Sequence, residues 1–293
     1  MFYREHWSRR LFVIANGIAL ALLAVACLFP LVHVLAISFS AGPAVSAGKV
    51  ILWPVDFTTS AYDFALSRPA FRSAFVVSVQ RVILGTVVNM VLTVLVAYPL
   101  SKENDVFPMR TVYTWFFIVT MLVSGGLIPL YMVVRWTGLL DSIWALVLPV
   151  AVPVFNVVLL MNFFRGLPKE LEEAAFVDGA SHWEVLFRIY LPLSMPAIAT
   201  LTLFSFVMHW NSWFDGLIFM NSPDNYPLQS YLQTLVIGQD LSQFSMDPKL
   251  LQLVSNDTFK AAQIFIGALP ILVLYPFLQR YFVKGIVLGS VKG

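Results

Sequence analysis

The chain contains 293 residues with a formal net charge of +2; 59% of the residues are hydrophobic and only 12% are charged. A soluble globular domain carries about 25% charged residues, so this composition excludes an ordinary water-soluble domain and favours a protein embedded in lipid. The small net charge argues against a nucleic-acid-binding surface. The single cysteine, Cys27, excludes an internal disulfide and a cysteine-based metal site.

Long apolar runs are the main structural signal. A helix needs about 20 apolar residues to cross roughly 30 Å of hydrocarbon. The first run continues past Cys27 and is too long for the hydrophobic region of a cleaved signal, so we interpret it as a membrane helix. The sequence therefore predicts an all-α integral membrane protein with six transmembrane helices, over Leu11–Ile37, Ala74–Leu100, Thr111–Val134, Ile143–Phe164, Ala197–Met220 and Ala261–Phe282.

The distribution of Lys and Arg predicts the orientation of these spans, because positively charged loops tend to stay in the cytoplasm. The basic residues are enriched before the first run, in the second and fourth connections, and after the sixth run. Both termini and the connection at about 165–193 are thus predicted to be cytoplasmic. The long connection at about 221–260 is predicted to lie on the opposite side, where it would fold over a partner.

These elements divide the chain into three parts. Residues 1–72 hold the cytoplasmic N-terminus, the first membrane helix and the first outer loop. Residues 73–283 form the core membrane domain, which includes both the 165–193 and the 221–260 connections. Residues 284–293 form a cytoplasmic tail.

The connection at 165–193 predicts a short helix–turn–helix in the cytoplasm. Pro168 begins the first helix at a position where its missing N–H costs nothing, and Gly179 supplies the backbone freedom that ends it. Ser181 then caps a second helix, with Glu184 three positions later completing a capping box. The small side chains of Ala174 and Ala175 would let another backbone come close, which indicates a docking surface.

One segment of this loop resembles a known motif. Glu173-Ala174-Ala175, three residues, Gly179, nine residues, then Ile189-x-Leu191-Pro192 is similar to the "EAA" loop of binding-protein-dependent ABC importers. In that family the loop contains the coupling helix, which fits a cleft in the ATP-binding subunit. The resemblance implies the MetI-like type I importer fold and a coupling role for Glu173, Ala174, Ala175, Asp178 and Gly179.

The resemblance extends over nearly the whole chain. The segments 51–62, 124–131, 138–144 and 209–213 are similar to the maltose-type, oligosaccharide-importing branch. The ending Gly289-Ser-Val-Lys292-Gly293 resembles a tail that reaches into the nucleotide-binding dimer, which adds Lys292 to the coupling residues. The implied function is a translocation pathway for an oligo- or polysaccharide, with the uronate polymer alginate as the specific expectation.

The resemblance also implies the partners. They are a second homologous permease subunit, an ATP-binding cassette ATPase dimer, a periplasmic or extracellular sugar-binding protein that meets the 221–260 connection, and membrane lipid, in the bacterial inner membrane. The sequence has neither a G-x-x-x-x-G-K-[ST] phosphate loop nor an H-E-x-x-H metal motif. We therefore expect no catalytic residue, cofactor or metal in this chain, and we expect ATP and Mg²⁺ to bind the ATPase subunits.

Polar residues inside the second apolar run form a stripe. Arg81, Gly85, Asn89 and Thr93 recur every four residues, so they share one helix face. Ionisable groups at membrane depth are expensive and usually face a cavity or a partner group. Arg81 and Asn89 are therefore candidates to line the passage, while helix–helix packing is the alternative explanation.

The fifth apolar run carries a second polar group. Asn211 and Asp215 are predicted to share a face of one helix, beside Trp213. Amide, carboxylate and flat aromatic groups suit the mixture of hydroxyls and C–H surface that a sugar presents. Two alternatives stay open: Trp213 marks the membrane interface, or Asp215 pairs with Arg81 in a purely structural contact.

Two other classes of function predict different sequences. A transporter or channel that acts without an ATPase would have no cytoplasmic docking loop and would usually carry an internal repeat with a charged site at the midplane. A membrane-embedded enzyme would need a convergent nucleophile, base or metal cluster, whereas His33 and His209 stand alone. We therefore favour the ATP-driven importer, with the ATP-independent transporter or channel as the alternative.

Overall fold

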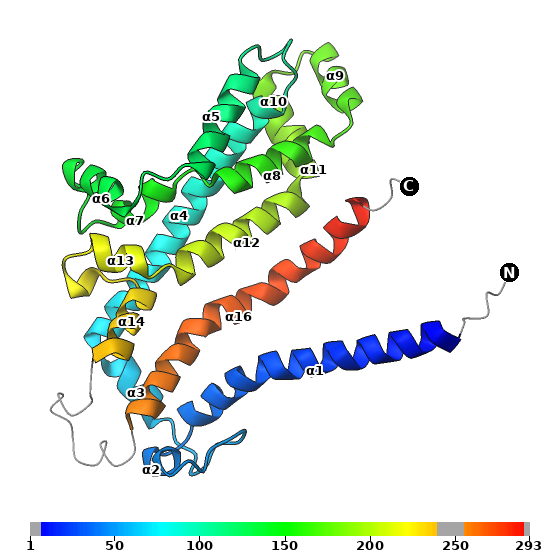
Figure 1. Ribbon diagram of the computed structural model, residues 1–293. Helices are drawn as coiled ribbons and strands as arrows, with labels where there is room; N and C mark the ends of the chain where they lie inside the picture. The colour runs from blue at the N-terminus through cyan, green and yellow to red at the C-terminus, as the bar shows by residue number, and fades with distance from the viewer. Residues whose placement is uncertain (1–6, 239–254, 290–293) are drawn as a thin grey trace. The chain divides into compact units, whose positions relative to one another are not determined.

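The computed structural model describes residues 7–238 and 255–289, which form helices joined by short connections (Figure 1). Lys292 and a large part of the predicted outward connection lie outside the described residues. The helices are α1 (Trp7–Ser38), α2 (Gly42–Ser46), α3 (Ser60–Ser67), α4 (Pro69–Ser101), α5 (Arg110–Leu122), α6 (Leu127–Trp136), α7 (Ile143–Val147), η1 (Leu148–Val150), α8 (Val154–Arg165), α9 (Lys169–Val177), α10 (His182–Val185), the π-helical η2 (Leu186–Tyr190), α11 (Leu191–Leu193), α12 (Met195–Asn211), α13 (Phe214–Phe219), η3 (Pro223–Asn225), α14 (Leu228–Gly238) and α16 (Asn256–Gly289).

The described helices fit six membrane spans by length and composition. Three of them, α1, α4 and the Asn256–Pro276 part of α16, are each long and apolar enough to cross a bilayer. Three further spans result if each bent pair of helices counts as one: α5 with α6, α7 and η1 with α8, and the 182–193 segment with α12. The bends are 111°, 47° and 82° respectively.

Three of the predicted spans are not continuous helices, which corrects the sequence prediction: Ile143–Phe164 breaks between η1 and α8, and two others break as follows. The predicted helix Thr111–Val134 breaks between α5 and α6, where Gly126 has a φ of +88° that only glycine adopts readily. The predicted helix Ala197–Met220 ends at Asn211. There Asp215 accepts hydrogen bonds from the Ser212 hydroxyl and the Gly216 N–H, and such local side-chain bonds compete with helix formation.

The chain forms two compact units. The first contains residues 1–69 and 234–269, and the second contains residues 70–233 and 270–293. In the first unit the Ser38 and Tyr62 hydroxyl groups lie 2.7 Å apart, and the Phe64 and Phe259 ring centroids are 4.9 Å apart. The predicted three-part division of the chain remains a prediction. The second unit contains the coupling loop and both polar groups that the sequence singled out.

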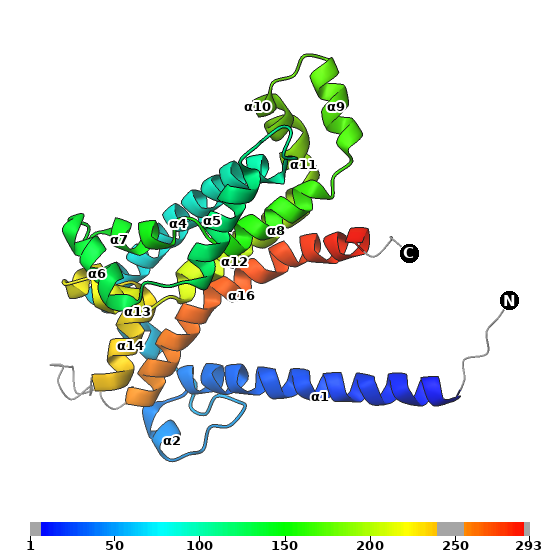
Figure 2. The ribbon, with the colours of Figure 1, turned by 45° about the horizontal axis from the view of Figure 1, so that its top comes forward.

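The second unit is organised around α4. In Figures 1 and 2 the α9–α10 segment lies toward the C-terminal end of α4, and α13 and α14 lie toward its other half. A hydrophobic core near the C-terminal end of α4 joins it to α8, η2 and α12; we call it the inner core. Its buried residues are Ala97, Tyr98, Leu100, Val157, Leu160, Met161, Phe164, Val185, Leu186, Tyr190 and Leu201.

Close packing of α4 against α12 depends on Gly85. A Cβ atom at this position would lie 2.4 Å from Nε2 of His209, a distance that real Cβ atoms do not show. His209 is itself 1% exposed, so its ring has no solvent space into which to move. The glycine therefore makes room for an imidazole in the helix interface, which is the use of small residues that membrane helix packing favours.

We predict that Gly85→Ala will lower the midpoint of thermal denaturation of the detergent-purified protein, because an added methyl group in a filled interface costs about 1–3 kcal/mol. The matched control is Gly17→Ala in α1, where an added Cβ meets nothing within 4 Å. That control should keep or slightly raise the midpoint, since alanine favours helix over glycine. Equal midpoints for the two variants would contradict the close packing at Gly85.

Candidate functional site

The connection at 165–193 forms the predicted pair of short helices. Pro168 immediately precedes α9, and Asp178 and Gly179 follow it, with Gly179 at a φ of +84°. Ser181 caps α10: its hydroxyl accepts the N–H of Glu184, and the Glu184 carboxylate accepts the N–H of Ser181 at 3.0 Å. The same Ser181 contacts lower the pKa of Glu184. Local hydrogen bonding therefore fixes the turn between the two helices.

The structure places the predicted coupling residues on different sides of α9. Glu173, Ala174, Asp178 and Gly179 are exposed, whereas Ala175 is half-buried and packs against the inner core. The two alanines therefore do not form one joint surface: Ala174 is available to a partner, and Ala175 holds α9 to its own chain.

Three exposed apolar side chains, which the sequence motif does not include, also belong to this loop. Val177, Trp183 and Phe187 are 87%, 60% and 58% exposed. The rings of Trp183 and Phe187 stack with their centroids 6.0 Å apart. Exposed apolar groups gathered on a polar loop mark interaction surfaces. The signal in the sequence is the presence of large apolar residues close to Gly179 in an otherwise polar loop.

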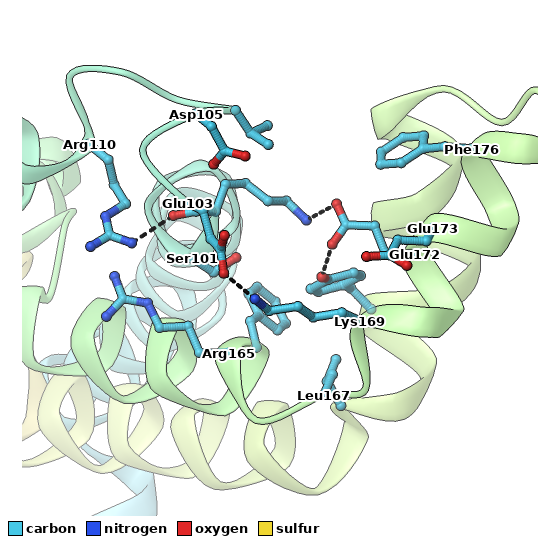
Figure 3. Close-up of a pocket in the computed structure, with 14 residues that line it drawn as sticks. Ser101, Glu103, Asp105, Arg110, Arg165, Leu167, Lys169, Glu172, Glu173 and Phe176 are labelled. Carbon is cyan, nitrogen blue, oxygen red and sulfur yellow. Dashed lines mark hydrogen bonds and ion pairs between the residues drawn. The ribbon is translucent and has the colours of Figure 1, made fainter.

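A cavity of about 440 Å³ lies between α9 and the connection from α4 to α5 (Figure 3). Basic and acidic side chains line it in equal number. Lys169 pairs with Glu103, while Arg110 and Arg165 donate to the backbone carbonyl groups of Lys102 and Leu100 at 2.8 and 2.9 Å. The two arginines therefore cover carbonyl groups at the end of α4 that have no partner in its helix.

A buried ion pair at the same cavity joins α9 to the end of α4. Lys102 Nζ donates to the Glu172 carboxylate at 2.6 Å, and the Tyr190 hydroxyl donates to the other oxygen of that carboxylate (Figure 3). The Lys102 ammonium also lies 4.1 Å from the ring centroids of both Tyr98 and Tyr190. We call these four residues the α4–α9 joint. Burial lowers the pKa of Lys102 below its ordinary value, and the hydrogen bond and charge of Glu172 only partly oppose this shift.

The sequence does not predict the α4–α9 joint, because it shows Lys102 and Glu172 separately and gives no sign of their contact. Lys102 lies two residues after the second apolar run, and Glu172 lies in the first turn of α9, where carboxylates complement the helix dipole. Nothing in the spacing indicates that the two meet. Their side chains are 7% and 16% exposed, so the pair is largely shielded from water.

The polar stripe on α4 is buried along its length. Arg81 is 1% exposed; it pairs with the Asp215 carboxylate and donates to the Ser212 carbonyl at 3.1 Å. The structural alternative for Arg81 and Asp215, a direct ion pair, is thus present. It ties α4 to the interruption between α12 and α13, because Ser212 belongs to that interruption and Asp215 to the first turn of α13.

Asn89 holds a second interruption. In the amide orientation that satisfies its neighbours, the two N–H groups of Asn89 are shared among the carbonyl groups of Gly85, Val150 and Ala151 at 3.1–3.2 Å, and its oxygen accepts from His209 Nε2 at 3.2 Å. Val150 and Ala151 precede the 47° bend between η1 and α8. Every group of this amide has a partner, and Asn89 is 0% exposed, which favours packing over contact with a substrate.

Asn211 and Trp213 lie at the interruption after α12 and remain accessible. Asn211 is the last residue of α12 and is exposed, and the Trp213 side chain is 40% exposed. Asp215 belongs to α13, so it does not share a continuous helix face with Asn211 as predicted. The Trp213 carbonyl accepts the Ser230 hydroxyl at 2.7 Å, which ties this interruption to α14.

A turn at the other end of the second unit is organised by Asp141. Its carboxylate accepts the N–H groups of Asn221 and Ser222 at 3.1 and 3.2 Å. Hydrogen bonds from the Asn225 side chain and from these backbone groups lower the pKa of Asp141. The carboxylate therefore fixes the first residues of the predicted outward connection.

No group of three or more His, Cys, Asp or Glu side chains that could hold a metal ion occurs in the described part of the chain. Within this loop, Glu172 pairs with Lys102 and Glu184 pairs with Arg188. These sites comprise an exposed loop surface that is suited to docking, two helix interruptions closed by buried polar groups, and the accessible side chains of Asn211 and Trp213.

The sequence profile of the family described as "Binding-protein-dependent transport system inner membrane component" matches residues 5–288. The chain belongs to this family. It is thus a permease component of a binding-protein-dependent transport system, an inner-membrane protein with several spans, as the EAA-like loop and the apolar runs predicted.

Individual relatives resemble this permease over nearly its whole length. The polygalacturonan/rhamnogalacturonan transport system permease protein YtcP of Bacillus subtilis (strain 168) is 40% identical over 280 residues, covering 94% of this chain and 96% of that protein. Protein LplC of the same organism is 39% identical over 284 residues, covering 97% and 96%. A chain in the crystal structure of a bacterial ABC transporter involved in the import of the acidic polysaccharide alginate aligns with a TM-score of 0.85 and 31% identity, covering 96% of this chain and 99% of that chain.

The Asp141 turn yields a prediction for the permease. Asp141→Ala should speed amide hydrogen exchange at Asn221 and Ser222 at neutral pH, because their N–H groups lose the acceptor. Since the pKa of Asp141 is lowered in the folded protein, its stabilisation is present above the ordinary value of about 4 and is lost as pH falls through the lower folded value. The wild-type turn should therefore keep its protection down to about pH 4.

Hydrogen-exchange mass spectrometry of peptides covering 219–226 measures this effect. Asp224→Ala is the matched control, since Asp224 is exposed in the same segment and its side chain accepts none of these amides. Equal exchange in both variants would contradict the role of Asp141.

Proposed function

We propose that this permease forms part of the translocation pathway of an ATP-driven importer for an acidic oligo- or polysaccharide. The observation that carries the proposal is the α9–Gly179–α10 turn, a capped and exposed docking element in a member of this family. The partners are a second permease subunit, an ATPase dimer that grips α9, and an extracytoplasmic binding protein that delivers the sugar. The distribution of Lys and Arg supports cytoplasmic termini.

The substrate class follows from the chemistry that two relatives share. One is named for polygalacturonan and rhamnogalacturonan transport, and the other comes from an importer of the acidic polysaccharide alginate. Both names describe sugar polymers that carry carboxylate groups. We infer that the cargo of this chain is also a uronate-containing saccharide, of which alginate is one example.

Catalysis is assigned to other subunits. We propose that ATP and Mg²⁺ bind the ATPase dimer and that this chain contributes no catalytic residue, which agrees with the lack of a phosphate-loop motif in its sequence. Glu173, Ala174, Asp178 and Gly179 form the exposed docking surface, with Lys292 as a second contact. Ala175 supports that surface from within.

We propose that Asn211 and Trp213 contact the sugar. Both are accessible at an interruption between helices, where freed backbone groups and an aromatic face meet. Arg81 and Asp215 position this interruption through their ion pair, and Asn89 supports the neighbouring bend. These five residues then act as one substrate pathway with different tasks.

The coupling assignment predicts the effect of a change at Gly179. Gly179→Val should reduce both ATPase retention and transport by about tenfold, because a β-branched residue at positive φ costs 1–2 kcal/mol or more. An added Cβ meets nothing within 4 Å, so the effect comes from backbone conformation and not from a clash. The readouts are co-purification of the ATPase and uptake into proteoliposomes.

The control is Gly179→Asn, because asparagine tolerates the left-handed conformation better than valine. It should retain most of the ATPase and most of the uptake. If the valine variant keeps normal ATPase retention and normal uptake, the coupling role of this turn is wrong. Uptake that persists when no ATPase is present would favour the ATP-independent transporter instead.

The pathway assignment predicts changed substrate recognition. Trp213→Ala and Asn211→Ala should raise the KM for uptake of a uronate oligosaccharide roughly fivefold to tenfold, since about 1 kcal/mol or more of contact is lost. Trp115→Ala is a control in α5, a helix without buried residues. Unchanged KM in all three variants would make Asn211 and Trp213 packing residues.

A further inference from the structure

The α4–α9 joint contains a buried ion pair, which is not needed merely to pack α9 against α4. Lys102 is 7% exposed and Glu172 is 16% exposed, so both charges have lost most of their water. Burial of two ions costs so much that an apolar pair of similar volume often holds a fold equally well or better. A charged pair nevertheless stands here, with one carboxylate oxygen bound to Lys102 and the other to Tyr190.

The geometry of the joint makes it stiff. The Lys102 ammonium lies between the Tyr98 and Tyr190 rings at 4.1 Å from each centroid, and these rings meet edge to face with centroids 5.2 Å apart. The ammonium is thus held by two aromatic faces and a carboxylate at once. If α9 moved away from α4, a buried charge would be left on each side without a partner.

The joint also lies where two moving parts would meet. Glu172 belongs to the helix that we assign to ATPase docking, and Lys102 directly follows α4, which is one unbroken helix of 33 residues. Along α4, Arg81 lies about 30 Å from Lys102. There it binds Ser212 and Asp215 at the interruption that also holds Asn211 and Trp213.

We propose that the α4–α9 joint is the mechanical link of this permease: it makes α9 and α4 move together, so that a displacement of α9 by the ATPase reaches the Ser212–Asp215 interruption through α4. Lys102, Glu172 and Tyr190 are positioning residues in this scheme. The proposal rests on the proposed docking of α9, and it assigns to these residues the transmission of motion after docking. Lys169 of α9 also pairs with Glu103, but this pair has no such role, because exposed ion pairs contribute little to stability.

The test compares transport per ATP hydrolysed in proteoliposomes that contain the complete importer, its ATPase and its binding protein. Lys102→Met keeps the aliphatic stem between the tyrosine rings and removes the charge; Tyr190→Phe removes one hydroxyl and keeps the ring. We expect both variants to retain the ATPase and hydrolyse ATP, while transport per ATP falls by about tenfold for Lys102→Met and by less for Tyr190→Phe.

Two variants separate the link from plain stability. Lys102→Arg keeps a cation at the same place and should restore most of the transport per ATP. Glu103→Gln breaks only the exposed pair and should leave the ratio unchanged. A purely structural role would lower the amount of assembled complex in the Met variant without changing the ratio in the complexes that form, and that result would overturn the proposal.

A covalent link provides an independent measurement. In a Cys27→Ser background, Lys102→Cys with Glu172→Cys removes the ion pair, and a short bismaleimide then joins α4 and α9 again. We expect low transport per ATP before the reaction and recovery after it. Loss of the remaining transport on cross-linking would mean that α9 must slide along α4, which contradicts the proposal.

Failure of the proposed function is distinguishable from failure of the link. If the wild-type permease does not retain the ATPase, the docking assignment fails, and the link fails with it. If the ATPase is retained and Lys102→Met or Tyr190→Phe transports normally per ATP, only the link is wrong. Where Lys102→Met does not assemble, the milder Tyr190→Phe variant decides the question.

Discussion

Hydrocarbon supplies no hydrogen-bond partners, and this constraint organises the polar groups along α4. Arg81 and Asn89 within α4, and Lys102 directly after its C-terminal end, are each almost fully buried, and each is matched by groups from a different part of the second unit. Arg81 binds the interruption after α12, Asn89 binds the bend before α8, and Lys102 binds α9. α4 and the residue that follows it therefore fix the positions of three other segments: the interruption after α12, the bend before α8, and α9.

Interrupted helices are possible in this permease because those breaks are satisfied from within. A helix that stops inside a membrane leaves carbonyl and N–H groups without partners, and each such group costs several kcal/mol in lipid. The Val150 and Ala151 carbonyl groups receive the Asn89 amide, and the Ser212 carbonyl receives Arg81. The interruption after α12 also leaves Asn211 and Trp213 accessible, so the backbone group satisfied by Arg81 and the proposed contact with sugar lie at the same place.

The coupling loop combines a rigid base with an open outer face. Its base is the α4–α9 joint together with Ala175, which packs against the inner core. Its outer face carries Ala174 and the strongly exposed Val177. The proposed docking of the ATPase needs both properties, because a partner can displace the permease only if the loop itself does not deform. This arrangement explains why the adjacent residues Ala174 and Ala175 differ: Ala174 is exposed, and Ala175 packs against the inner core.

Much of this protein could be predicted from local sequence, because the relevant physics acts over a few residues. Apolar run length predicts the membrane spans, and Pro168, Gly179 and the Ser181–Glu184 capping box predict the docking turn; the EAA-like spacing indicates the family. The Arg81–Asp215 pair could be stated only as one of two alternatives. Hydrophobicity could not show that the third, fourth and fifth runs break, because the composition stays apolar across each break. In the third and fifth runs, Gly126 and Asp215 act through backbone conformation and local hydrogen bonds. The partners of Asn89 and Lys102 lie far away in the chain, so only the tertiary structure decided that Asn89 fills a helix interface and that Lys102 joins the end of α4 to α9.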